Sequence, residues 1–154
     1  MNLKNNGGVC EMRKQKKVVF SEWKVKHKNY YHKGLSSTYH IKEIVLYRDY
    51  KISEDKRIEE GILISHKEKN ITLKEKEYKA GQEHLIGYHY ISLISDDKDV
   101  LWIQGNITDK KSKYVVFNKE TTTPLCNLTN KDKAMRVFKR ELLEKYGLEL
   151  RNNL

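Results

Sequence analysis

The feature that most constrains this fold is one well-marked helix near the C-terminus. Four apolar residues recur at every fourth position and therefore share one helix face: Ala134, Phe138, Leu142 and Tyr146. Thr129 is the expected N-cap, with Asp132 three residues later returning a hydrogen bond to the cap. Gly147 supplies the left-handed residue that ends a helix. The pattern predicts a helix over about 130–146.

Upstream of this helix, β-branched and aromatic residues alternate with polar residues in stretches separated by polar turns. The expected strands are 17–25, 39–50, 61–65, 71–73, 84–94, 100–107, 113–117 and 125–128. The alternation slips near Glu43, which predicts a β-bulge there. We expect a loop over 53–60, a turn over 67–69, and a short helix or loop over the charged stretch 74–82. The order predicts an α+β fold, an antiparallel β-meander of about six to eight short strands closed by one C-terminal helix.

A length of 154 residues predicts a single domain, which we place at 13–154. Residues 1–12 are expected to form a flexible N-terminal segment, and Met12, preceded by Gly7 and Gly8, is an alternative native start. The two cysteines form no metal-binding motif, and no apolar stretch is long enough to cross a membrane or to direct secretion. We therefore expect a cytoplasmic protein without membrane association.

The chain is strongly basic, with 31 Lys and Arg against 21 Asp and Glu and a formal net charge of +10. A field of that sign attracts polyanions, so nucleic acid is the first candidate partner and an acidic or nucleic-acid-binding protein complex the second. The competing interpretation is that the charge serves solubility alone. An exposed edge strand would permit a homodimer.

Two groups of residues are candidates for nucleic-acid binding, because cations hold phosphates and aromatic rings stack on bases. The first group lies near the N-terminus: Lys14, Lys16, Lys17, Trp23, Lys24, Lys26, Lys28, Tyr30 and Tyr31. The second group lies on the polar face of the expected helix: Lys133, Arg136, Lys139 and Arg140. The alternative for the first group is that Phe20 and Trp23 belong to the core and the lysines form its solvated side.

Between Asp99 and Gly147 the expected elements are three strands followed by one helix. This order resembles the DNA-binding domains in which a three-stranded sheet enters the major groove and a C-terminal helix braces it. The arm-binding domain of some tyrosine integrases and the plant AP2 domain are of this type. The resemblance implies that the exposed sheet face reads bases, through Trp102, Gln104, Lys113, Tyr114 and Lys119.

A nuclease site is the weakest of the candidate chemistries. Glu77-Tyr78-Lys79 has the E-x-K form in which a carboxylate binds a metal ion and a lysine steadies the attacking water. The upstream acid would be Asp55, Glu59 or Glu60. The six histidines form no H-x-H or H-E-x-x-H motif, and the chain has no glycine-rich phosphate loop, so we expect no metal and no cofactor.

Three functions follow from these patterns. The first is a small basic, non-catalytic, nucleic-acid-associated accessory protein of phage or mobile-element origin. The second is a protein-binding inhibitor of a bacterial defence complex, anti-CRISPR-like or otherwise anti-defence. Short Lys-, Ile- and Asn-rich chains without a catalytic motif are typical of the proteins that phages and mobile elements carry, and these often block a host defence complex. The third is a metal-dependent nuclease built on Glu77 and Lys79.

Overall fold

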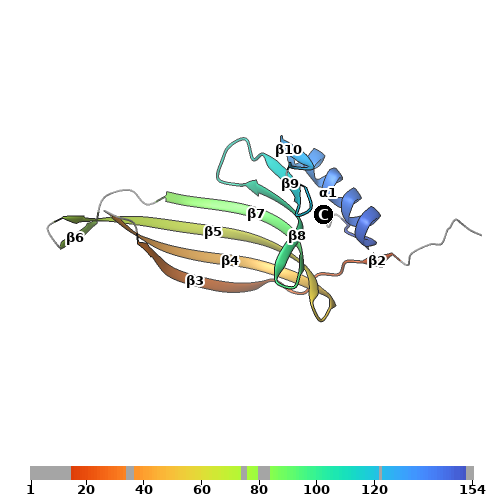
Figure 1. The fold of residues 1–154 in the computed structure, drawn as a ribbon, viewed down its shortest axis with the longest axis horizontal. Coiled ribbons are helices and arrows are strands. Elements are labelled where there is room, and N and C mark those ends of the chain that lie inside the picture. The colour runs from red at the N-terminus through yellow and green to blue at the C-terminus, as the bar shows by residue number, and fades with distance from the viewer. Residues whose placement is uncertain (1–14, 34–36, 74–75, 80–83, 122, 152–154) are drawn as a thin grey trace, which may run out of the picture.

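Figure 1 shows the fold as a computed structural model, which describes residues 15–33, 37–73, 76–79, 84–121 and 123–151. The main sheet is antiparallel and runs in the order β10-β9-β8-β7-β5-β4-β3, with β6 pairing with the far end of β5. Its strands are β3 (Lys24–Lys33), β4 (Ser37–Ser53), β5 (Lys56–Leu73), β6 (Lys76–Lys79), β7 (His84–Ser95), β8 (Lys98–Asn106), β9 (Tyr114–Asn118) and β10 (Cys126–Thr129). The C-terminal helix is α1 (Lys131–Tyr146). The predicted α+β meander closed by one C-terminal helix is confirmed.

A small second sheet ties the N-terminal part of the chain to its C-terminal part. In it, β2 (Lys16–Lys17) runs parallel to β11 (Leu148–Glu149), which directly follows α1. The expected strand 17–25 is therefore wrong in its bounds. The chain leaves β2 at Lys17 and pairs with β4 only from Lys24 onward.

The β4–β5 hairpin is longer than the sequence predicts. It is paired from Ser37 opposite Ile71 to Ser53 opposite Lys56. The expected loop 53–60 is therefore reduced to a turn at Glu54 and Asp55, and the expected turn 67–69 is wrong. The pairing is regular through Glu43, and the register shift lies instead near the turn, between Lys51 and Ser53.

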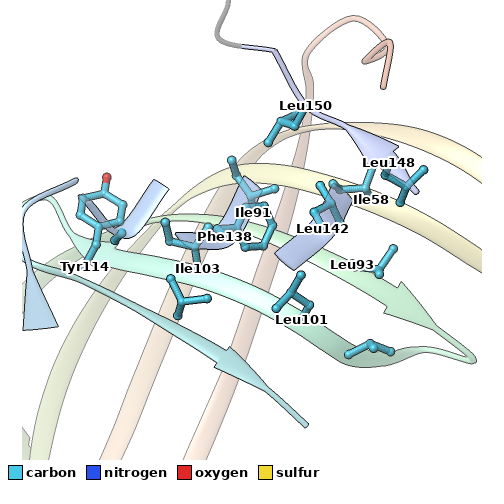
Figure 2. Packing of buried hydrophobic residues seen from close by; sticks show 13 residues of the cluster. Ile58, Ile91, Leu93, Leu101, Ile103, Tyr114, Phe138, Leu142, Leu148 and Leu150 are labelled. Carbon is cyan, nitrogen blue, oxygen red and sulfur yellow. The ribbon is translucent and has the colours of Figure 1, made fainter. Parts of the chain in front are cut away.

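The helix lies on one face of the sheet and buries its predicted apolar stripe. Figure 2 shows Phe138 and Leu142 of α1 among Ile58, Leu101 and Ile103 of the sheet. Each of these five side chains is fully buried. Burying large apolar side chains is the main stabilising term in a domain of this size, so this cluster is the core of the molecule.

The helix ends are capped as its sequence allows, with one correction. The N-cap is Asn130, whose side chain accepts a hydrogen bond from the backbone N–H of Lys133, and not Thr129. Thr129 is unavailable because it is the last residue of β10 and pairs with Tyr114. Gly147 has φ 66° and closes the helix with its N–H directed at Leu143 O, as predicted.

The helix covers only one end of the sheet. It contacts β8, β9, β10 and β11, and the far halves of β3, β4, β5 and β7 extend well beyond it in Figure 1. At ~1.5 Å per residue, the 16 residues of α1 span roughly 24 Å, whereas the 18 residues of β5 span roughly 60 Å. Within the described ranges, no helix has the length and apolar character needed to cross a membrane.

Candidate interaction surfaces

The two faces of the sheet are distinguished by residue parity, because successive side chains of a strand point to opposite sides. Ile58, Ile91 and Ile103 point toward α1, and we call this the helix-side face. Their sequence neighbours point to the other side, which we call the open face.

An apolar patch lies on the helix-side face, beyond the end of the helix. It consists of Val25, Ile44, Leu46, Ile64 and Ile107. Val25 is opposite Leu46 in the register, and Ile44 is opposite Ile64, so the patch crosses three adjacent strands. The exposed fractions are 56% for Val25 and 47% for Ile44.

Ile107 completes the patch from the segment that follows β8. Gly87 is opposite Ile64, and a Cβ placed on Gly87 would lie 3.1 Å from the Cγ1 atom of Ile107. Ile107 therefore packs over the backbone of Gly87 while remaining 41% exposed. A soluble domain rarely exposes contiguous β-branched side chains over several strands unless another molecule covers them.

Aromatic rings flank the apolar patch on the helix-side face, with Tyr31 toward the far end of β3 and β4 and Trp23 toward the helix. Tyr31 is 69% exposed and stacks on His40 of β4, with ring centroids 4.4 Å apart. Trp23 is 44% exposed and lies against the guanidinium of Arg48, 4.7 Å from ring centroid to Cζ. These side chains present large, rigid contact area beside the apolar patch.

A chain of polar contacts separates the apolar patch from the helix-covered core. Glu60 accepts hydrogen bonds from Arg48 Nε at 2.9 Å and Nη2 at 2.6 Å, and it contacts His89 Nε2 at 2.8 Å. The other ring nitrogen of His89 lies 2.8 Å from the hydroxyl of Tyr114. The four residues come from β4, β5, β7 and β9, so the chain of contacts fixes the mutual register of these strands.

The electrostatics of Glu60 follow from these contacts. Burial alone would raise the pKa of Glu60, but the hydrogen bonds from His89 and Arg48 outweigh it and hold the pKa below its ordinary value. The pKa of the Tyr114 hydroxyl is raised by burial and by the nearby charge of Glu60. Both ring nitrogens of His89 are engaged, so this arrangement ties strands together and leaves no free base for proton transfer. A pocket of about 130 Å³ adjoins it, between Glu60, Lys131 and Arg151.

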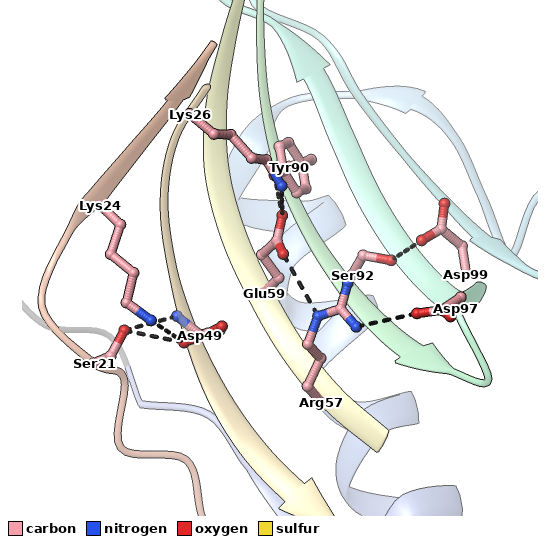
Figure 3. Close-up of polar contacts among 10 residues, drawn as sticks. All are labelled: Ser21, Lys24, Lys26, Asp49, Arg57, Glu59, Tyr90, Ser92, Asp97 and Asp99. Atoms are coloured by element: carbon pink, nitrogen blue, oxygen red, sulfur yellow. Dashed lines mark hydrogen bonds and ion pairs between the residues drawn. The ribbon is translucent and has the colours of Figure 1, made fainter. Parts of the chain in front are cut away.

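The open face carries a second polar cluster, shown in Figure 3. Glu59 is 5% exposed and accepts a hydrogen bond from Tyr90. Burial is the largest cause that raises the pKa of the Tyr90 hydroxyl, and the hydrogen bond to Glu59 raises it further. Lys26 Nζ and Arg57 Nε each lie 3.7 Å from a Glu59 oxygen. The cluster therefore balances a buried carboxylate with two cations.

Three lysines of the N-terminal candidate group lie in β3 on its open face, and two of them are paired with carboxylates. Lys24 Nζ is 3.2 Å from Asp49, and Lys26 bonds Glu59 and lies 4.4 Å from the Tyr47 ring centroid. Lys28 is opposite Glu43 in the register, and Tyr30 donates a hydrogen bond to Glu43 at 3.4 Å.

The remaining members of this group are scattered. Lys16 and Lys17 are exposed in β2, close to the end of α1. Trp23 and Tyr31 lie on the helix-side face, opposite the lysines of β3. Lys14 lies outside the described residues.

The helix candidates form a separate basic stripe on the outer side of α1. Lys133, Arg136 and Arg140 are exposed, and no carboxylate of the described residues pairs with them. Lys139 is partly buried, and this burial lowers its pKa. Because α1 lies on the helix-side face and the lysines of β3 point to the open face, the structure does not bring the two groups onto one surface.

The nuclease motif is not supported by the strand register. In β6, Glu77 is opposite Thr72, which lies twelve residues along the same strand from Glu60, a distance of roughly 40 Å. Glu59 and Asp55 lie still farther from Thr72. The side chains of Glu77 and Lys79 lie outside the described residues, and the rest of the described chain contains no His, Cys, Asp and Glu cluster able to hold a metal ion.

The structure contains the expected order of three strands and a helix, but one residue that was expected to read bases does not lie on the exposed sheet face. Trp102 and Gln104 point to the open face, where Trp102 stacks on Phe117 with centroids 5.3 Å apart. Lys113 and Lys119 are exposed. Tyr114 is 2% exposed and points toward α1, so the expectation that it reads bases is wrong.

The apolar patch was not identified from the sequence, because the alternation of a strand does not tell a covered face from an exposed one. Comparisons with protein-family models, curated proteins and solved structures found no match to this chain.

Proposed function

We propose that this chain is a non-catalytic protein-binding module that docks through the apolar patch. The observation that carries the proposal is the exposed set of Val, Ile and Leu side chains on three adjacent strands, beyond the reach of α1. A patch of this kind on a soluble domain marks a site that another macromolecule covers. The paired lysines of β3 weaken the competing idea of a polyanion surface there.

Burial of this patch would supply part of the free energy that specific binding needs. Full burial of an exposed Val, Leu or Ile side chain contributes about 1.5–3 kcal/mol, so burying the half-exposed residues of the patch contributes about 1 kcal/mol each. The five residues together then supply about 5 kcal/mol before other contacts are counted. Trp23 and Tyr31 add rigid aromatic contacts at its border.

The partner surface that fits the charge is an acidic protein surface, including an acidic region of a protein complex that handles nucleic acid. A formal charge of +10 speeds association with such a surface and disfavours basic partners. An inhibitor that occupies an acidic surface of a bacterial defence complex combines these properties. This is the biological role that we propose.

The test compares partner capture by the wild-type chain and by Ile44→Glu, from nuclease-treated host lysate. Ile44 is exposed, so the substitution removes apolar contact without opening the core. Leu128→Glu is the matched control, since Leu128 is 64% exposed on β10, outside the patch. We expect the same protein to be retained by the wild type and Leu128→Glu and lost by Ile44→Glu. Equal retention by both variants would refute docking through the patch.

Nucleic-acid binding is a second candidate, supported by the basic stripe on α1. Lys133, Arg136 and Arg140 are exposed and unpaired within the described chain, as phosphate-contacting side chains should be. Mobility shifts of duplex and single-stranded probes at two salt concentrations test it. Arg136→Glu should weaken binding and flatten its salt dependence, whereas Lys110→Glu, in an exposed turn, should change it less. Absence of any shift at low salt would exclude this candidate.

A further inference from the structure

The outer edge of β3 is an open strand edge. The order of the main sheet ends at β3, and no strand of the described residues pairs with its other side. Every second residue of its ten therefore directs a backbone N–H and C=O away from β4. Figure 1 shows β3 at the margin of the sheet, alongside β4 over its whole length. The opposite edge, β10, has only four residues and an irregular register, so it offers a much shorter template.

The side chains of β3 differ between the two faces. Lys24, Lys26 and Lys28 point to the open face, and β3 contains no acidic residue. Val25 points to the helix-side face, where it forms the border of the apolar patch. A strand added beside β3 would thus meet lysines on one face and, on the other, Val25 and Tyr31 separated by His27 and Asn29.

This pattern excludes a second copy of β3 as the natural occupant. Two antiparallel copies related by a twofold axis keep the same face on the same side, so residues of equal parity lie opposite one another. The lysines of one copy would then face lysines of the other, and like charges directly opposite are destabilising. Lysines on an edge strand are a known device against such self-pairing.

We propose that β3 binds an extended segment of the partner protein by strand addition, and that this segment alternates acidic and apolar residues. Its carboxylates would lie on the open face, closest to Lys28, which no carboxylate of the described residues pairs with, because Lys24 and Lys26 already contact Asp49 and Glu59. Its apolar side chains would lie beside Val25 and Tyr31 on the helix-side face. Backbone hydrogen bonds supply affinity in this mode of recognition, and the alternating side chains supply specificity. The inference rests on the proposed protein-binding function and names the chemistry of the partner.

The probe is a blocked synthetic heptapeptide in which Glu alternates with Ile and Val, titrated into the isotope-labelled full chain. We expect saturable binding with backbone amide shifts concentrated on β3. A peptide of equal composition without the alternation should bind at least tenfold more weakly. Two N-methylated peptides isolate the contribution of backbone hydrogen bonds. One carries N-methyl groups on the backbone amides of its Glu residues, and the other carries them on the backbone amides of its Ile and Val residues. Because alternate amides of a strand point to opposite edges, one of the two should lose binding and the other keep it.

Lys28→Glu should weaken binding about tenfold, because it turns an attractive cross-strand pair into a repulsive one, whereas Lys110→Glu should leave it unchanged. Equal binding of the two N-methylated peptides, or of the peptide without alternation, would overturn strand addition. A concentration-dependent dimer in sedimentation that Lys28→Glu strengthens would overturn it too, by assigning the edge to a second copy.

The two proposals can fail separately. If the peptide results contradict strand addition while capture still depends on Ile44, strand addition is refuted and the proposed function stands. If the peptide binds as expected but capture does not depend on Ile44, docking through the patch is refuted.

Discussion

Replacing Glu60 by Gln tests whether the polar contacts beside the apolar patch hold the strands in place. Glu60 is the centre of this arrangement, since one of its oxygens accepts both bonds from Arg48 and the other contacts His89. Its side chain is 15% exposed and that of Arg48 is 22% exposed, so neither charge is well screened by water. Gln keeps the shape of Glu but removes the charge and one acceptor.

The expected cost follows from the bonds that are lost. A hydrogen bond to a charged group contributes about 1.5–3 kcal/mol, and the variant loses one such bond and weakens two. We therefore expect the free energy of unfolding to fall by about 2–3 kcal/mol at pH 7. For a domain of this length, that corresponds to a melting temperature lower by roughly 5–10 °C.

The pH dependence gives the prediction its sharpest form. The pKa of folded Glu60 lies below its ordinary value of 4.5, so the carboxylate stabilises the fold fully above that pH. This contribution is lost as the pH falls through the lower pKa of the folded state. The difference between the wild type and Glu60→Gln should therefore be full at pH 7 and shrink progressively below about pH 4.5.

Urea unfolding of both proteins at pH 7 and pH 3.5 measures this difference. Glu54→Gln is the control, because Glu54 is 97% exposed and lies 3.6 Å from Lys51 in a surface pair that should contribute little. If Glu60→Gln is no more destabilised at pH 7 than Glu54→Gln, the reasoning about these contacts is refuted. A difference that stays constant down to pH 3.5 would refute the assignment to the ionised carboxylate.

Three further substitutions test the core and the turns. Phe138→Ala should lower the free energy of unfolding by about 3–5 kcal/mol in urea titrations, because a fully buried ring leaves a cavity; a loss below 1 kcal/mol would place Phe138 outside the core. Gly105→Ala should cost about 1–3 kcal/mol in the same assay, since a Cβ at Gly105 would collide with the ring of Tyr114; an unchanged midpoint would contradict this packing. Asp97→Gly should raise the melting temperature in calorimetry by roughly 1–4 °C, because Asp97 has φ 61° in the β7–β8 turn; a lower value would contradict this turn geometry.

The helix could be predicted from the sequence because its determinants are local. The four-residue spacing of Ala134, Phe138 and Leu142 and the stop at Gly147 are contained within one segment. The cap was misplaced by one residue because Thr129 and Asn130 are both suitable side chains. The choice between them depends on β10 pairing with β9, which is a contact between separate segments.

The long hairpin could not be predicted because its determinants are distant in sequence. The charged residues between 53 and 60 resemble a loop when they are considered alone. In the fold, Glu59 and Glu60 are held in strand β5 by cations and hydrogen bonds from β3, β4 and β7. When the cations and hydrogen-bond donors around a buried carboxylate come from distant parts of the sequence, the sequence alone does not distinguish it from a solvent-exposed carboxylate.

The exposure of the apolar patch could not be predicted from the sequence for a related reason. Ile44 and Leu46 have the alternation of a half-buried strand, and that pattern does not specify what covers them. Whether they are covered depends on the lengths of two elements, one helix of 16 residues and one strand of 18. The difference between those lengths leaves part of the sheet as a single layer.

Strand β5 belongs to both parts of the molecule, and this has a consequence for amide hydrogen exchange. Ile58 lies fully buried under the helix, whereas Ile64, six residues along the same strand, is 41% exposed. Amides near Ile58 can exchange only when the core opens, while those near Ile64 can exchange through smaller openings of the uncovered layer. A single continuous strand should thus record two different protection levels, with the boundary at the edge of the helix. A partner bound to the patch would raise the lower level and leave the higher one nearly unchanged.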